Sequence, residues 1–228
     1  MSCKNIFLAY TVHIQKLLNI FLSIIMKKDF FLFRHGQTDL NVQGRWQGST
    51  SDALLNQTGK EQAEILRQTI ISKNLQLDKL YSSPLLRAVQ TANIIADQGW
   101  HRLNYMVLHD LREGNFGECE GLTFEESRQK YGDELIDTYF NPTFDTWDVK
   151  FPGGESKHEI FKRVQSCLKY IFQINPWIYD NRLGIVCHAG VISSLKCGLN
   201  LKEVSCENCS ILHLRYDTDT EQFTQILD

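Results

Sequence analysis

The segment FFLFRHG, residues 30–36, places a charged pair directly after an apolar run. The four apolar residues predict a strand that is buried on both faces, and Arg34 and His35 follow at its carboxyl end. Open α/β sheets bind their ligands at this end of their strands. Gly36 has no side chain, so a ligand can approach the backbone there. The segment therefore predicts a site where Arg34 binds an anion that His35 attacks; an ordinary solvated strand end is the alternative.

Length and composition set limits on the class of protein. A chain of 228 residues fits one α/β domain with a large core. Its formal net charge of -3 gives no general attraction to nucleic acid or to anionic membranes, so we expect a small-molecule partner that is bound by a local cationic cluster. Seven cysteines, an odd number, are atypical of a disulfide framework and indicate a reducing, cytoplasmic compartment. Whether the chain forms a homodimer stays open.

The first 25 residues are expected to form an apolar extension outside the fold. Their apolar run, Leu17 to Met26, falls well short of the roughly 20 residues that a helix needs to cross a bilayer, so no stable membrane insertion is expected. A signal peptide and an amphipathic surface helix are the alternatives. The predicted strand starts just after Met26 and needs nothing before it, which favours one domain over residues 26–228.

A loop and a helix are predicted after the first strand. Residues 41–57 are rich in Gly, Gln, Ser, Thr and Asp, which is typical of a loop. A helix is then expected to begin at Asn56 or at Thr58, because Thr58 and Glu61 fit a capping box ahead of an apolar stripe.

The next strand and helix carry a second arginine. Residues 79–82 predict a short strand, and Ser83 and Pro84 fit the cap and the first position of the following helix. Arg87 then lies in the first helical turn, where a cation opposes the helix dipole. A bound anion would relieve that repulsion, so Arg87 is a second candidate for the anion site; a solvated surface arginine is the alternative.

The middle of the chain predicts a wall for a pocket. A short strand is expected at 106–108, and Thr123 caps a helix that runs to about Tyr131. The aromatic-rich stretch from there to Phe151 is predicted to be irregular. Such a segment is a candidate lid or wall.

An apolar strand followed by a histidine then occurs a second time. Ser156 and Glu159 form a capping box before a long amphipathic helix. Residues 183–187 predict a buried strand that ends at His188, and another helix follows. The last two predicted strands are at 212–216 and 223–227.

Five motifs occur in order along the chain: R-H-G at 34–36, S-S-P-x-x-R-A-x-Q-T-A at 82–92, L-R-E-x-x-F-G-x-x-E-G at 111–121, P-G-G-E-S at 152–156 and H-A-G at 188–190. Each motif is weak alone, whereas the whole set, each at the predicted end of an element, is specific. Over about residues 26–216 the chain resembles the histidine phosphatase superfamily, which has the phosphoglycerate mutase-like fold. The resemblance implies a three-layer α/β/α fold with a mostly parallel central sheet.

The resemblance also implies roles for the matched residues. His35 matches the nucleophile that becomes phosphohistidine, and Glu113 matches the proton donor. Residues expected to contact the substrate are Arg34, Asn41, Gln47, Arg87, His188 and Ala189, of which Gln47 is included for its nearness to the first motif. No metal or cofactor is expected, because cationic side chains neutralise the phosphoryl charge. Cys206 and Cys209 form a single C-x-x-C pair, and the sequence near it lacks the further ligands that a zinc site needs.

Three activities are compatible with this layout. A mutase must return the phosphoryl group to the bound substrate and exclude water, whereas a phosphatase must admit water. The interval between Glu113 and His188 is shorter than in glycolytic mutases, and P-G-G-E-S looks more like the phosphatase branch. We therefore expect a phosphomonoesterase for a small phosphorylated metabolite; the alternatives are a phosphoglycerate mutase-type isomerase and an inactive phospholigand-binding protein. Specificity is expected from residues 41–51 and 123–151.

Overall fold

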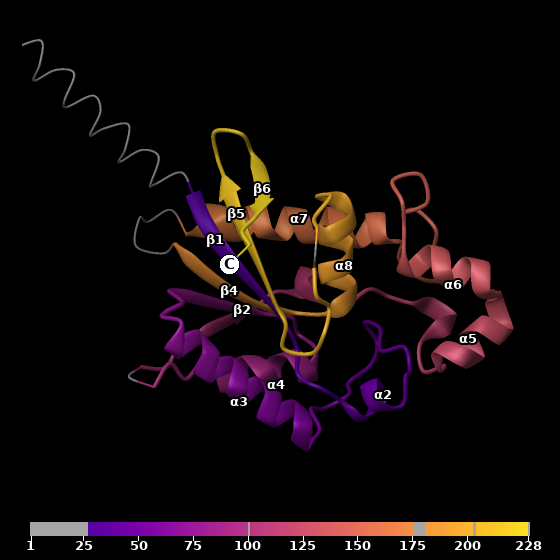
Figure 1. Cartoon of the computed structure of the whole chain (residues 1–228), viewed down its shortest axis with the longest axis horizontal. Coiled ribbons are helices and arrows are strands. Elements are labelled where there is room, and N and C mark those ends of the chain that lie inside the picture. Colours follow the sequence, from indigo (N-terminus) through magenta and orange to yellow (C-terminus); the bar gives the residue numbers. More distant parts are fainter. Residues whose placement is uncertain (1–26, 100, 176–180, 203, 228) are drawn as a thin grey trace, which may run out of the picture.

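The computed structural model describes residues 27–99, 101–175, 181–202 and 204–227. Its strands are β1 (Lys27–Arg34), β2 (Lys79–Ser82), β3 (Tyr105–Val107), β4 (Arg182–Cys187), β5 (Ile211–Asp217) and β6 (Gln222–Gln225). They form one six-stranded sheet in the order β3-β2-β4-β1-β5-β6 (Figure 1). Strands β1 to β4 run parallel, β5 is antiparallel to β1, and β6 is antiparallel to β5. Each of the predicted strands is present.

Helices cover both faces of this sheet. The described helices are α2 (Asp39–Val42), α3 (Gln57–Ser72), α4 (Leu86–Ile95), α5 (Phe124–Tyr131), α6 (Asp133–Phe140), α7 (Lys157–Ile174) and α8 (Ala189–Gly198), and two short 3-10 turns span His109–Leu111 and Gly117–Cys119. In Figure 1, α3 and α4 lie on one side of the sheet, and α7 and α8 lie on the other.

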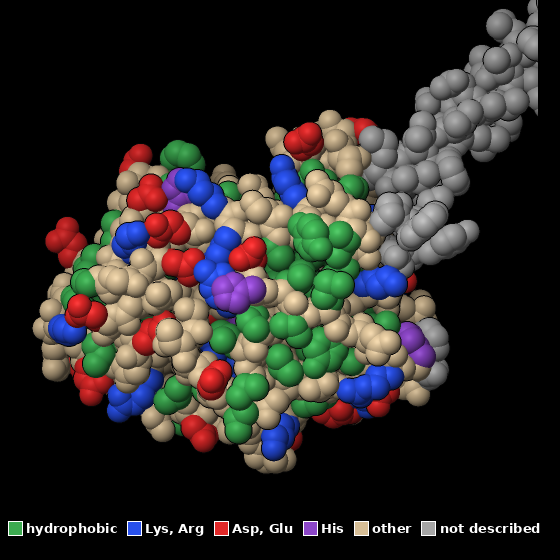
Figure 2. All heavy atoms as spheres, turned by 180° about the vertical axis from the view of Figure 1, so that it is seen from behind, with side chains coloured by type: hydrophobic (Ala, Val, Ile, Leu, Met, Phe, Trp, Pro, Cys, Tyr) green, Lys and Arg blue, Asp and Glu red, His purple; other side chains and the backbone are tan. Residues whose placement is uncertain are grey.

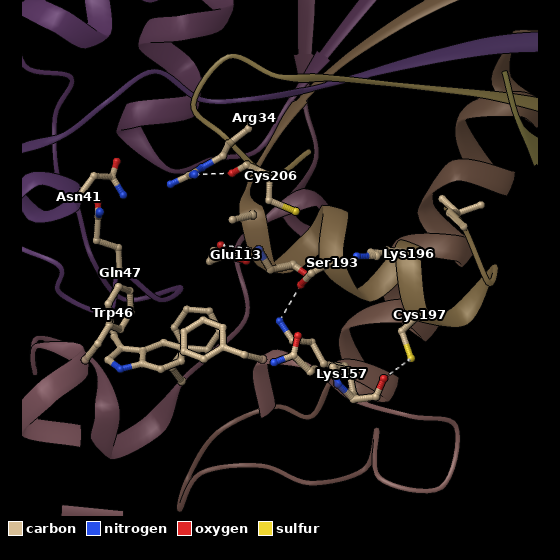
Figure 3. Close-up of a pocket in the computed structure, with 18 of the residues that line it drawn as sticks. Arg34, Asn41, Trp46, Gln47, Glu113, Lys157, Ser193, Lys196, Cys197 and Cys206 are labelled. Carbon is tan, nitrogen blue, oxygen red and sulfur yellow. Dashed lines mark hydrogen bonds between the residues drawn. The ribbon is translucent and has the colours of Figure 1, made fainter. Parts of the chain in front are cut away.

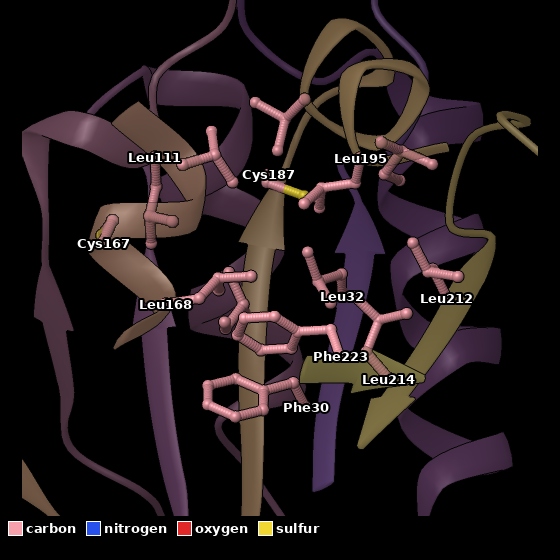
Figure 4. Packing of buried hydrophobic residues seen from close by; sticks show 14 of the residues in the cluster. Phe30, Leu32, Leu111, Cys167, Leu168, Cys187, Leu195, Leu212, Leu214 and Phe223 are labelled. Atoms are coloured by element: carbon pink, nitrogen blue, oxygen red, sulfur yellow. The ribbon is translucent and has the colours of Figure 1, made fainter. Parts of the chain in front are cut away.

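Alternate residues of β1 enter two separate cores. Phe30 and Leu32 pack with α7 and α8, as Figure 4 shows, whereas Phe31 and Phe33 pack with α3 and α4. Burying a side chain of this size contributes about 1.5–3 kcal/mol. A strand buried on both faces needs a helical layer on each side, so the predicted three-layer α/β/α fold with a mostly parallel sheet is confirmed.

Strands β1 and β4 lie side by side and end at the same edge of the sheet. Arg34, the last residue of β1, pairs with Cys187, the last residue of β4. The next residues, His35 and His188, therefore leave the sheet beside each other although they are distant in sequence. This edge is the carboxyl end of the parallel strands, where α/β proteins bind their ligands.

A third, smaller core lies to one side of the sheet, where Figure 1 shows α5 and α6. The Trp46 ring stacks on Phe140 with ring centroids 5.0 Å apart. The Trp46 indole N–H donates to the Ser127 hydroxyl of α5 at 3.0 Å. This core joins the loop after α2 to both helices.

Two segments that the sequence predicts to be irregular contain helices. The stretch up to Phe151 includes α6, because Ile136 and Tyr139 lie about one turn apart and both are buried in the third core. Asn41 lies within α2 rather than in a loop. Its side chain completes a capping box with Thr38, a pattern that an asparagine in place of Glu or Gln conceals in the sequence.

The helix starts are partly as predicted. Of the two proposed starts for α3, Asn56 is right and Thr58 is wrong, because the Asn56 side chain accepts a hydrogen bond from the N–H of Gly59 at 2.8 Å. The capping boxes that begin at Thr123 and Ser156 are confirmed.

The start of α4 differs from the prediction. The helix begins at Leu86, after Ser83 and Pro84, and no side chain caps it. The Ser83 hydroxyl is instead bonded to Nε2 of His188 at 2.7 Å. A residue that resembles a helix cap therefore belongs to the candidate site.

The prediction for residues 1–25 concerns residues outside those that the structure describes, so the boundary of the domain at residue 26 stays a prediction. Among the described helices, none is both long and apolar enough to cross a membrane. On the described part of the face in Figure 2, basic and acidic side chains are interspersed rather than gathered into one charged field.

Candidate active site

His35 follows β1, and one of its ring nitrogens is bonded to the backbone. Its Nδ1 lies 2.7 Å from the carbonyl oxygen of Gly36. Because a carbonyl oxygen only accepts, Nδ1 carries the proton and donates it, and Nε2 of the neutral ring keeps its lone pair. The side chain is 3% exposed but lines a cavity. The structure thus holds His35 in the tautomer that attack through Nε2 requires.

The backbone around His35 packs closely on the start of α3. A Cβ atom at Gly36 would lie 2.3 Å from the carbonyl oxygen of Gly59, and a Cβ atom at Gly59 would lie 2.0 Å from the carbonyl oxygen of Gln37. The N–H of Gly36 donates to the Thr91 hydroxyl of α4 at 3.1 Å. Only glycine fits at both positions, and the segment that carries the histidine is fixed between two helices.

Two arginines at this edge have their guanidinium groups held by backbone carbonyls. Arg34 donates from Nη1 to the carbonyl oxygen of Cys206. Arg87, fully buried in the first turn of α4, donates to the carbonyl oxygens of Ser51 at 2.7 Å and Gly48 at 3.2 Å. Within the described residues neither arginine forms an ion pair. Burial lowers the pKa of Arg87 to about 10, so it stays charged at neutral pH.

His188 follows β4 and is held by a chain of two hydrogen bonds. The N–H of Leu85 lies 3.3 Å from the Ser83 hydroxyl oxygen, which is 2.7 Å from Nε2 of His188. Since the hydroxyl oxygen accepts from Leu85, its own proton is free to be donated to Nε2. In the tautomer in which Ser83 donates to Nε2, Nδ1 of His188 carries the proton, and Nδ1 has no partner among the described residues.

Four buried nitrogen atoms of the predicted site lack a hydrogen-bond partner in the described structure: Nε of Arg34, Nε2 of Gln47, Nε of Arg87 and Nδ1 of His188. The positive charges of Arg34 and Arg87 act on His35, the His188 ring centre lies 5.2 Å from that of His35, and Gln47 lines the same cavity as His35. Leaving a buried donor unpaired costs about 1–3 kcal/mol. An oxyanion, which only accepts, would satisfy several such donors at once.

Burial determines the protonation of both histidines. It lowers the pKa of His35 well below its ordinary value, and the neighbouring charges of Arg87 and Arg34 lower it further. Burial likewise lowers the pKa of His188, with Arg87 as the next cause. Both rings are therefore neutral at pH 7 before an anion binds.

These lowered pKa values predict that the protein loses stability below about pH 6.5. In that range unfolded chains protonate His35 and His188 whereas the folded protein does not, so the unfolded state binds more protons and the free energy of unfolding falls as pH falls. Each histidine contributes a slope of at most about 1.4 kcal/mol per pH unit. Urea unfolding in phosphate-free buffer at pH 7.5, 6.5 and 5.5 should show this loss, and His35→Asn should reduce the slope by about half. An equal slope in the variant would contradict the assignment.

Glu113 lies 4% exposed beside the start of α8. Its Oε1 accepts from the N–H of Gly114 at 2.8 Å, and its Oε2 accepts from the N–H of Gly190 at 3.0 Å. A Cβ atom at Gly190 would lie 2.2 Å from Oε1. The glycine of the H-A-G motif therefore makes room for this carboxyl group, and Ala189 beside it lines the cavity.

Arg163 on α7 supports the segment that carries Glu113. Its guanidinium donates to the carbonyl oxygens of Asp110 at 2.8 Å, Arg112 at 2.9 Å and Glu113 at 3.0 Å, and to the Glu155 carboxylate at 2.8 Å. The group is 12% exposed. A single side chain thus fixes the backbone that positions the candidate proton donor.

A cavity of about 870 Å³ opens on His35 and Glu113 (Figure 3). One wall is aromatic and comes from the third core and the segment after α6: Trp46, Phe116, Phe124, Phe140 and Phe144. The prediction that the stretch from about Tyr131 to Phe151 supplies a pocket wall is confirmed, because residues 140–144 line the cavity. The opposite wall includes Lys157 of α7, residues of α8, and Asn200, Leu201 and Cys206, and of these residues the sequence predicted Ala189 alone as a contact.

Asn41 and Gln47 line the cavity on the side of Arg34 in Figure 3. The Thr38 hydroxyl donates to Oε1 of Gln47 at 2.7 Å, which aims the Gln47 amide and leaves its Nε2 without a partner in the described structure. Arg87 is not among the residues that line the cavity; its side chain is fully buried.

Three residues at the site escape sequence reasoning. Glu120 accepts from the N–H of Phe116 at 3.1 Å and from Thr50, so it holds the loop whose carbonyls bind Arg87. Arg163 is the second, and Lys157, which lines the cavity, is the third. Lysine at the first position of a helix opposes the helix dipole, and this is the one local signal that could have indicated Lys157.

The fold and these residues define a class: an α/β protein with buried, unpartnered nitrogen atoms and a neutral histidine at the carboxyl edge of its parallel strands. The chain belongs to branch 1 of the histidine phosphatase superfamily, whose family model matches residues 30–228.

Known proteins resemble the chain over most of its length. A phosphoglycerate mutase-like protein 4 of Arabidopsis thaliana is 33% identical over 168 residues, which cover 73% of this chain and 69% of that protein. An uncharacterized phosphatase, PhoE, of Bacillus subtilis is 31% identical over 164 residues, which cover 72% of this chain and 73% of that one. The structure of a mycobacterial glucosyl-3-phosphoglycerate phosphatase with VO3 matches with a TM-score of 0.74 at 27% identity and covers 88% of this chain and 97% of that one. The family and its phosphatase relatives identify the chain as a phosphatase.

Proposed function

We propose that the chain hydrolyses a small phosphomonoester in two steps, through a phosphohistidine on His35. The observation that carries the proposal is the free Nε2 of His35 among four buried N–H donors without a partner in the described structure. These donors and two guanidinium charges suit the oxygens of a phosphoryl group. The cavity beside His35 leaves room for the alcohol part of the ester.

In the first step Nε2 of His35 attacks phosphorus and the ester P–O bond breaks. The proton stays on Nδ1 and keeps its hydrogen bond to the Gly36 carbonyl oxygen, which supports the positive charge that develops on the ring. Arg34, Arg87 and His188 stabilise the charge on the phosphoryl oxygens. Glu113, in its carboxylic acid form, gives its proton to the leaving alkoxide.

In the second step a water molecule attacks the phosphohistidine. Glu113, now a carboxylate, takes a proton from that water, the N–P bond breaks, and the electron pair returns to Nε2 of His35. Orthophosphate leaves and the site regains its starting state. The same carboxyl group thus serves as acid and then as base, and no metal takes part in either step.

A mutase-type isomerase is the second candidate activity. It would need the same nucleophile, but it would return the phosphoryl group to another hydroxyl of the retained alcohol. The size of the cavity, about 870 Å³, favours hydrolysis, because it leaves space for water beside a small alcohol.

Phosphate release by the full chain, without added metal, tests the proposal. The substrates are p-nitrophenyl phosphate, glycerol 3-phosphate and 3-phosphoglycerate, and isomerisation of 3-phosphoglycerate is followed in parallel. Release that exceeds isomerisation is expected. Isomerisation without release would make the protein a mutase, and the absence of both from every substrate would favour an inactive phospholigand-binding protein.

A further inference from the structure

Lys157 places an ammonium group in the cavity wall opposite the aromatic residues. It is the first residue of α7 and is 5% exposed. Its Nζ donates to the Ser193 hydroxyl of α8 at 2.7 Å and lies 4.7 Å from the centre of the Tyr139 ring. Figure 3 shows this hydrogen bond between the neighbouring side chains of Lys157 and Ser193.

This ammonium has no carboxylate partner within the described residues. Glu113 attracts it, but both Glu113 oxygens already accept hydrogen bonds from backbone N–H groups. An ammonium has three protons to donate, and Ser193 accepts one of them. Burial lowers the pKa of Lys157, and its place at a helix N-terminus adds repulsion. A buried cation with unused donors requires an anion for full stabilisation.

The other charged residues of the cavity point to the same kind of ligand. Of the described residues that line it, four are cationic, namely Arg34, Arg45, Lys157 and Lys196, and the carboxylate among them is Glu113. Arg34 is assigned to the phosphoryl group. Of the remaining cations, Arg45 is paired with the Glu126 carboxylate at 3.3 Å, whereas Lys157 lines the cavity without such a partner within the described residues.

We propose that Lys157 and Ser193 bind a second anionic group on the leaving alcohol, so that the enzyme selects phosphomonoesters that also carry a carboxylate or a second phosphate. A substrate that carries an ammonium group on its alcohol part should bind less well, because the cations of the cavity would repel that group. The proposal rests on the phosphatase activity proposed above and names the class of its substrate.

Matched substrates test this selection. 3-Phosphoglycerate and glycerol 3-phosphate differ by a carboxylate in place of a hydroxymethyl group, and O-phosphoserine differs from 3-phosphoglycerate by an ammonium in place of a hydroxyl. We expect the wild-type kcat/KM to be highest for 3-phosphoglycerate. The values for glycerol 3-phosphate and for O-phosphoserine should both be lower. Glycerol 1,3-bisphosphate shows which anionic group the subsite prefers. If its kcat/KM exceeds that of 3-phosphoglycerate, the subsite binds a second phosphate, and if its kcat/KM is lower, the subsite binds a carboxylate.

The variant Lys157→Met removes the charge and keeps the length of the side chain. We expect kcat/KM for 3-phosphoglycerate to fall about 10- to 100-fold, the size of a lost charged hydrogen bond, while kcat/KM for glycerol 3-phosphate changes less than about threefold. Lys162→Met is the matched control, because Lys162 is exposed on the same helix and is not among the cavity residues. It should change neither value. Lys157→Arg should retain part of the preference.

The outcomes separate this inference from the proposed function. Equal losses on both substrates in Lys157→Met, with wild-type thermal unfolding, would overturn the subsite and leave the phosphatase intact. If Lys157→Met does not fold, Ser193→Ala replaces it, and an unchanged ratio of the two kcat/KM values in that variant overturns the subsite. Wild-type protein that releases phosphate from none of these esters, p-nitrophenyl phosphate included, overturns both proposals.

Discussion

Replacing His35 with alanine should abolish phosphate release, with a loss of at least about 10⁴-fold in kcat from every phosphomonoester. The reason is that Nε2 of His35 keeps its lone pair in the cavity, next to the positive charges of Arg34 and Arg87. A second readout is the covalent intermediate. Wild-type protein mixed with substrate and quenched in alkali should carry one acid-labile phosphoryl group by intact mass, and His35→Ala should carry none.

A matched control separates chemistry from stability in that experiment. His109→Ala removes an exposed histidine whose side chain is 76% accessible, and it should keep both the rate and the intermediate. If His35→Ala still turned over, or if the phosphoryl group mapped to another residue, the assignment of the nucleophile would be wrong.

Glu113→Gln should lower the rate in proportion to how poor the leaving group is. Release from an alkyl ester such as glycerol 3-phosphate should fall about 10²- to 10⁴-fold, because the alkoxide no longer receives a proton. Release from p-nitrophenyl phosphate, whose leaving group needs no proton, should fall much less. Comparing kcat/KM for the two esters in one variant cancels any uniform loss of binding.

The backbone bonds of Glu113 require one check on this experiment. Both of its oxygens accept from N–H groups, whereas the amide of glutamine has one acceptor oxygen, so the variant leaves Gly114 or Gly190 facing an NH₂ group. Thermal unfolding measures the stability lost through this mismatch. Glu113→Ala is a second variant, in which no NH₂ group faces a backbone N–H. Equal losses on alkyl and aryl esters in both variants would exclude a proton-donor role.

The sequence contains enough information for the sheet and for the core of the site. The unbroken apolar run in β1 and the similar run before His188 predict two buried parallel strands, and parallel strands end at one edge of the sheet. Arg87 could be predicted as part of the anion site because a cation in the first turn of a helix is repelled by the helix dipole. These inferences depend on local patterns or on adjacency within one sheet.

The remaining parts depend on contacts between distant segments. The apolar positions of α6 make sense only once the third core exists, and Ser83 is indistinguishable from a helix cap until His188 is placed beside it. Lys157 follows a correct capping box, yet its side chain enters the cavity because Ser193 of α8 lies opposite. Such pairings have no signature within a single stretch of residues.

Helix α7 bears on how this enzyme can diverge. Its first residue, Lys157, lines the cavity, and Arg163, less than two turns later, binds the backbone of Glu113. A substitution that displaces the helix to admit a different alcohol would also displace the proton donor. On this wall of the cavity, a change in substrate range therefore also changes the rate of turnover. In the aromatic wall Phe116 lies three residues after Glu113, but Phe140 and Phe144 belong to α6 and to the segment after it, which hold none of the residues assigned to the chemistry. New specificities should therefore arise by changes in that wall, where selection can act on binding without disturbing the chemistry.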